Sequence, residues 1–169
     1  MDQPIPYLQN NLGVFEEGFH PTSPISLAIT AILALIPCPE DVNYQNHECQ
    51  LFRRRYAQYL AQSAFETLED DEDIPDSSIE PSKPLSEEHI HSFRSPFHPR
   101  LPVELESIVA LNILSVYEYA QRGNLKKMQN RAGQALMNAM EMELHSCEVE
   151  DEFSEARRRV WWMTVRPCL

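Results

Sequence analysis

The chain of 169 residues, with a mass of 19.6 kDa, is long enough for one domain with a sizeable core and too short for two. Hydrophobic residues make up 43% and charged residues 24%, which excludes complete disorder and a fibrous repeat. With 14 Lys and Arg against 26 Asp and Glu, the net charge of −12 disfavours a protein that grips nucleic acid by neutralising phosphates.

The cysteines and the amino terminus indicate an intracellular chain without a membrane anchor. The four cysteines contain no Cys-x-x-Cys pair, so we interpret them as reduced thiols rather than as a zinc site or a disulfide framework. Residues 1–6 lack the basic and apolar regions of a secretory signal. The longest apolar stretch, 25–36, is shorter than the roughly 18 residues that a bilayer requires.

The first half of the chain predicts two helices. Ser23 followed by Pro24 is a typical helix start, and Pro37 predicts its end. A second helix is predicted from about Tyr44 to Leu68. Its expected buried face consists of apolar residues at steps of three and four, namely Phe52, Tyr56, Tyr59, Leu60, Ala64 and Leu68.

An acidic, proline- and serine-rich stretch follows. Between Glu66 and Glu88 ten acidic residues stand against Lys83 alone, a local net charge of −9. Such a stretch buries too little apolar area to offset its ordering entropy, so we expect a solvated linker over 69–101. We favour this spacer over an acidic patch that binds a partner.

The second half predicts a helical hairpin and a last helix. A helix opens at Pro102 and ends at Gly123, which offers a left-handed backbone. Asn124 is expected to cap the next helix, which runs to about His145. A final helix is predicted from about Ser154, and Pro167 ends it. No segment of the sequence alternates with the period of two that predicts a strand.

The predicted fold class is therefore all-α, an irregular helical bundle of αα-hairpins with a disordered acidic linker, and we expect the domain to be incomplete. The expected organisation is an amino-terminal extension over 1–22, a first helical part over 23–68, the linker over 69–101 and a second helical part over 102–169.

Candidate chemistry is sparse. His89 and His91 form a His-x-His pair, but the pair falls in the expected linker, where no rigid element holds the two side chains in a geometry that binds a metal. His145 and Cys147 are the one pair that suggests a base and a nucleophile, and we interpret them as a helix-terminal cation and a buried thiol. No glycine-rich phosphate loop is present. We expect no catalytic, cofactor-binding or metal-ligating residue, and no enzyme.

Two adjacent tryptophans are more informative. Neighbouring helical residues point about 100° apart, so Trp161 and Trp162 together cover a broad arc of surface. Leaving both in water would expose a large apolar area, so we expect at least one to be buried. We hypothesise that a partner or a further part of the domain covers this face.

Two segments resemble the regulatory domain specific to fungal zinc-cluster transcription factors, the middle homology region of the xylanolytic-activator type. The first reads YEYAQRGNL at residues 117–125, before a helix rich in Ala and Met, and the second reads EARRRVWW at residues 155–162. After residue 164 the family helix would continue, whereas this chain reads VRPCL, so we expect a truncated domain. The family-motif residues, with an expected structural or interaction role, are Tyr117, Tyr119, Gly123, Asn124, Arg157, Arg158, Arg159, Trp161 and Trp162.

The resemblance implies a regulatory-domain fragment of a nuclear regulator of RNA polymerase II transcription. In that family a separate amino-terminal module with six cysteines binds zinc and DNA, and this sequence contains no such module, so zinc and DNA contacts are expected only there. Expected partners are other proteins, the rest of a longer regulator or, for the full-length protein, a second copy of itself in a homodimer, and no membrane is expected. The alternative is a free-standing helical adaptor that binds another protein through its Trp161 and Trp162 face.

Overall fold

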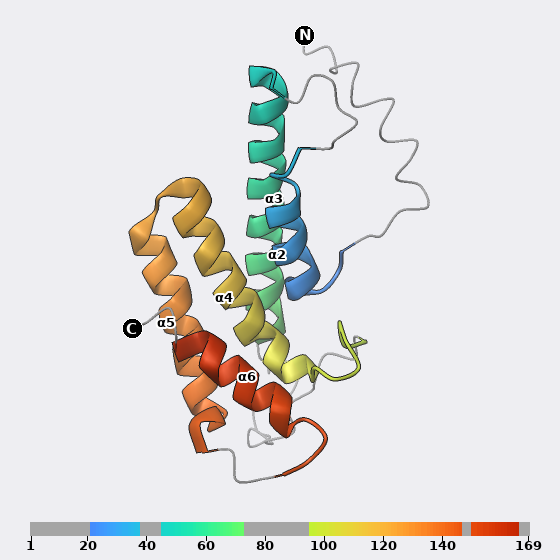
Figure 1. Ribbon diagram of the computed structural model, residues 1–169, viewed down its shortest axis with the longest axis vertical. Coiled ribbons are helices and arrows are strands. Elements are labelled where there is room, and N and C mark those ends of the chain that lie inside the picture. Colours follow the sequence, from blue (N-terminus) through green and yellow to red (C-terminus); the bar gives the residue numbers. More distant parts are fainter. Residues whose placement is uncertain (1–20, 38–44, 73–94, 147–149, 166–169) are drawn as a thin grey trace, which may run out of the picture.

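The computed structural model describes residues 21–37, 45–72, 95–146 and 150–165, and within them the fold is all-α, as predicted (Figure 1). Helices α2 and α3 run antiparallel, α4 and α5 form a hairpin, and α6 lies across the end of that hairpin opposite its turn (Figure 1). No strand occurs in these ranges. The elements are α2 (Pro24–Leu33), α3 (His47–Glu72), α4 (Val103–Arg122), α5 (Leu125–Glu141), the 3₁₀ helix η3 (Leu144–Ser146) and α6 (Ser154–Val165).

Helix α2 begins where the sequence predicts, with a reciprocal cap. The Ser23 hydroxyl accepts from the Ser26 backbone N–H at 3.1 Å, and the Ser26 hydroxyl accepts from the Ser23 N–H at 3.0 Å. Pro24 occupies the first helical position, where its missing N–H costs nothing. The α-helical part ends at Leu33, and turns lead from there to Pro37.

Helix α3 is shifted relative to its predicted bounds of 44–68. It starts at His47, after the Asn46 carboxamide, which accepts from the Glu48 N–H at 3.1 Å. It continues to Glu72, so the expected linker does not begin at residue 69. The helix thus continues for one turn beyond the buried Leu68. Residues 73–94 of the expected linker lie outside the described residues.

The predicted buried face of α3 is wrong in its first half. Phe52, Tyr56 and Tyr59 are exposed, and the first two rings stack on each other at 6.1 Å between centroids. Ala57 is fully buried although it lies between Tyr56 and Tyr59 in the chain, so neighbouring helices cover α3 at this level, and the three rings lie on a different side of the helix from its buried residues. The periodicity identifies residues that share a face, but not which face the neighbouring helices cover. The buried residues of α3 are Ala57, Leu60, Ala61, Ala64 and Leu68.

The turn between α4 and α5 follows the prediction closely. Gly123 has φ 59°, and its N–H and that of Asn124 donate to the carbonyls of Tyr119 and Glu118, which closes the end of α4. The Asn124 carboxamide then accepts from the Lys127 N–H at 3.1 Å and caps α5.

Helix α5 ends earlier than predicted, at Glu141 instead of near His145. The backbone leaves the α-helix through Glu143, whose φ is 54°, and continues as η3. This change of direction turns the Leu144 side chain into the core, where it is almost completely buried. Tertiary burial therefore overrides the helical pattern of the sequence at this point.

Helix α4 lies at the centre of the fold. It packs against α2, α3, α5 and α6, so the two helical parts of the chain share one core. Ile25 of α2 and Leu105 and Ile108 of α4 are the largest apolar side chains in it that are fully enclosed. Burial of such a side chain contributes about 1.5–3 kcal/mol.

Two polar contacts fix the ends of this assembly. The Asn112 amide of α4 donates to the Thr164 hydroxyl of α6 at 2.8 Å, with both side chains buried. The fully buried Glu106 carboxylate accepts from the Phe97 backbone N–H at 2.6 Å. This contact holds the end of the expected linker against the start of α4, although residues 95–100 are exposed to solvent.

Substitutions at two glycines of the hairpin test how backbone conformation affects its stability. Gly123 has a left-handed backbone, whereas Gly133 lies inside α5, and an added Cβ would meet no neighbour within 4 Å at either site. We expect Gly123→Ala to lower the free energy of unfolding by about 1 kcal/mol and Gly133→Ala to raise it by about 0.5–1 kcal/mol. Urea unfolding followed by circular dichroism measures both, and effects of the same sign would contradict the assignment.

Candidate functional site

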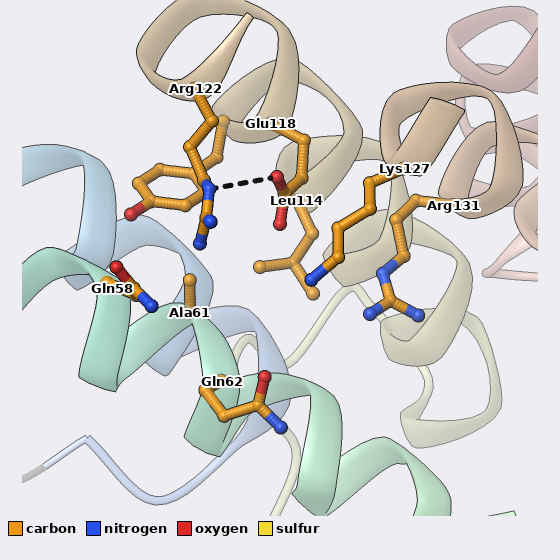
Figure 2. A pocket seen from close by; sticks show the side chains of 9 residues that line it. Gln58, Ala61, Gln62, Leu114, Glu118, Arg122, Lys127 and Arg131 are labelled. Carbon is orange, nitrogen blue, oxygen red and sulfur yellow. Dashed lines mark ion pairs between the residues drawn. The ribbon is translucent and has the colours of Figure 1, made fainter. Parts of the chain in front are cut away.

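A polar pocket of about 110 Å³ opens between α3, α4 and α5 (Figure 2). Polar side chains from all three helices surround it, and the buried Ala61, Leu114 and Tyr117 complete its lining. Figure 2 shows the side chains of α4 and α5 pointing toward α3, which contributes two glutamines and an alanine. The lining residues are Gln58, Ala61, Gln62, Leu114, Tyr117, Glu118, Arg122, Lys127 and Arg131.

Helical spacing places these side chains together. Gln58 and Gln62 lie four residues apart on α3, as Lys127 and Arg131 do on α5, so each pair shares one face of its helix. The buried Leu114 side chain of α4 lies below them. Since the turn at Gly123 folds α5 back along α4, the cations of α5 come to lie opposite the amides of α3.

Glu118 is the acidic member of the pocket. The residue is 8% exposed, and its Oε2 lies 3.5 Å from Nε of Arg122, one helical turn further along α4. Within the described part of the chain, this oxygen accepts no hydrogen bond of good geometry. A buried carboxylate oxygen in that position has unused capacity to accept a hydrogen bond from whatever enters the pocket.

Arg131 forms the wall toward the end of α3. Its guanidinium carbon lies 3.2 Å from the centroid of the Phe65 ring, a cation–π contact between α5 and α3. Burial lowers the pKa of Arg131, and the charges of Glu118 and Glu69 partly oppose that shift. Arginine stays protonated at neutral pH in proteins, so the group is a fixed positive charge.

The Tyr117 phenol belongs to the base of the pocket. Burial raises the pKa of Tyr117 above its ordinary value of 10.0, the Arg122 charge lowers it and the Glu118 charge raises it. The phenol is therefore neutral over the physiological range and is available as a hydrogen-bond donor or acceptor.

The family-motif residues of the hairpin have different positions. Tyr117 lines the pocket, whereas Tyr119 is exposed. Gly123 and Asn124 form the turn described above. The second motif segment lies on α6, across the opposite end of the hairpin (Figure 1). The structure thus does not bring the two segments into one site.

The arginine triplet of α6 forms ion pairs with nearby acidic residues. Arg157 binds the Asp151 carboxylate through two hydrogen bonds of 2.9 and 2.8 Å. Arg159 lies 2.7 Å from Glu155, and Arg158 lies within 4 Å of the same carboxylate. Hydrogen bonding from Arg157 is the main reason that the pKa of Asp151 is lowered from its ordinary 3.8. These pairs connect α6 to the loop before it and to its own first turn.

The tryptophan pair is divided between core and solvent. Trp161 is partly buried against the core, and its ring lies 5.9 Å from that of His145. Trp162 is 64% exposed. The expectation that one ring is buried holds only in part, because neither is enclosed completely.

The remaining sequence candidates contribute little. His89, His91 and Cys147 lie outside the described residues, and His145 is exposed beside Trp161. In the described ranges no three His, Cys, Asp or Glu side chains are close enough to hold a metal ion. No helix in those ranges is both long and apolar enough to cross a bilayer.

Sequence reasoning missed most of the pocket. Its overlooked polar residues are Gln58, Gln62, Glu118, Arg122, Lys127 and Arg131. The only local signal is the spacing of four residues within each pair, which is also common on solvated helix faces. Their convergence depends on the packing of three helices, which the spacing does not specify.

Comparisons with models of protein families, with curated proteins and with solved structures found no match to this chain.

The bidentate pair between Arg157 of α6 and Asp151 of the preceding loop allows a test of the structural role of the α6 arginines. We expect Arg157→Gln to raise the pKa of Asp151 toward 3.8, and Arg158→Gln to leave it unchanged. Because the pKa is lowered, the pair stabilises the fold at pH values above the ordinary pKa of the carboxyl group. This stabilisation is lost as the pH falls through the pKa of the folded state. Titration of the Asp151 carboxyl carbon by NMR measures this, and equal shifts in both variants would contradict the assignment.

Proposed function

We propose that this chain supplies helices of the regulatory domain of a fungal zinc-cluster transcription factor, which acts in the nucleus on RNA polymerase II transcription and is not an enzyme. The main support is the order of two segments that resemble the family, at residues 117–125 and 155–162. In this fold the first contains the turn of a helical hairpin, and the second lies in a helix that packs on the other end of that hairpin. Zinc and DNA binding would belong to the family's separate module.

The roles of the motif residues support this proposal. Gly123 and Asn124 form the turn, Arg157 connects α6 to the preceding loop, and Trp161 packs against the core. These are packing and capping roles, which suit a segment that acts as a folded interaction domain. Exposed surface such as Tyr119 and Trp162 then remains for contact with other parts of a regulator or with other proteins.

A tethering experiment tests the proposal. We expect the 169-residue chain, fused to an unrelated DNA-binding module, to change transcription of a reporter gene in fungal nuclei relative to the module alone. The control is Ile108→Asp, which puts a charge at a fully buried position and so unfolds the core and abolishes the effect. A stable fusion in the nucleus that leaves transcription unchanged would contradict a regulatory role.

Exposure of Trp162 favours a second candidate, an adaptor that works at its own size. The two candidates differ in the mass of the cellular protein, which an antibody against residues 103–145 reveals on an immunoblot. A band far above 19.6 kDa is expected for a segment of a zinc-cluster regulator, whereas a band at 19.6 kDa favours the adaptor.

A further inference from the structure

We propose that the pocket between α3, α4 and α5 binds a small dianion that also carries an O–H or N–H donor, such as hydrogen phosphate or a hydroxydicarboxylate. The inference rests on the pocket alone and goes beyond the proposed role in transcription. It is argued from the charges, from one carboxylate oxygen and from the size of the cavity (Figure 2).

The charge of the pocket is opposite to that of the chain. Among the lining residues Arg122, Lys127 and Arg131 stand against Glu118, a net of +2, and Glu69 outside the lining also acts on Arg131, in a protein with a net charge of −12. Figure 2 shows these cations extending from α4 and α5 into the same space. Three like charges gathered in this way repel one another, and an anion placed among them relieves that repulsion.

Glu118 adds a requirement that a simple anion does not meet. Its Oε2 is buried and accepts no hydrogen bond from the described residues, although Arg122 lies 3.5 Å away. Sulfate would bring only acceptor oxygens toward this carboxylate. Hydrogen phosphate brings an O–H group that can donate a hydrogen bond to it. The donor therefore distinguishes ligands of equal charge.

The remaining lining fits a small polar ligand. A volume of about 110 Å³ accommodates several water-sized groups, on the scale of phosphate or of a short dicarboxylate. Gln58 and Gln62 lie at the edge toward α3, and amides both donate and accept, although the Gln62 nitrogen already donates one hydrogen bond to the Glu66 carboxylate at 3.1 Å. Leu114 and Tyr117 close the base, so a long ligand does not pass through.

Two pairs of probes separate charge from hydrogen bonding. Hydrogen phosphate and sulfate are small dianions at a pH of about 8, and only the first carries a donor. Malate and succinate are dicarboxylates that differ by one hydroxyl. In calorimetric titrations of the full chain at low ionic strength, we expect the donor-bearing member of each pair to bind about tenfold more tightly. The tighter of phosphate and malate identifies the preferred anionic group.

Matched variants locate the binding. Lys127→Gln removes a lining charge, and Lys126→Gln removes the same charge from the neighbouring exposed position outside the pocket. We expect Lys127→Gln to weaken binding about tenfold and Lys126→Gln to change it little. Glu118→Gln, which removes the negative charge, is expected to narrow the preference for phosphate over sulfate. Arg122→Gln, checked for folding by circular dichroism, is a second cation variant.

The outcomes are decisive. Preference for the donor-bearing anions, lost in Lys127→Gln and kept in Lys126→Gln, supports the proposal. Equal binding within each pair overturns it, because charge alone then accounts for the affinity. An equal loss in both lysine variants, or the absence of heat at millimolar anion, also overturns it. None of these results bears on the reporter experiment, so the two proposals fail or succeed separately.

Discussion

Burial of α4 on most of its sides is the constraint on which this fold depends. Leu105 and Ile108 are enclosed in a core to which α2, α3, α5 and α6 contribute by packing around the same helix. Neither the α2–α3 pair nor the α4–α5 hairpin therefore has a complete core by itself. The hydrogen bond between Asn112 and Thr164 extends this dependence to α6, since a buried amide without its partner costs stability.

The pocket occupies the place where this central packing ends. Toward the Gly123 turn, the surface of α4 between α3 and α5 changes from the buried Leu114 to the charged Glu118 and Arg122. Long cationic side chains span the gap there instead of apolar ones. The pocket is thus a product of the same hairpin that completes the core, and the residues that hold the turn also fix the positions of its cations.

Several aromatic side chains outside the pocket are exposed to solvent. Phe52, Tyr56 and Tyr59 on α3 and Trp162 on α6 expose aromatic rings, and none of these residues lines the pocket. For a regulatory domain such rings are available for contacts with other parts of a regulator, and for an adaptor they are available for a partner. In either case binding of a small anion and binding of a protein would use different parts of the molecule.

The sequence by itself determined the local features: the starts of α2 and α5 at Ser23 and Asn124, the end of α4 at Gly123, and the all-α class. Those features depend on hydrogen bonds and backbone angles within a few residues, which residue type dictates. Only the tertiary structure decided which face of α3 is buried, where α5 stops and which cations converge on Glu118. These depend on contacts between helices distant in the chain, and periodicity within one helix contains no information about where its neighbours lie.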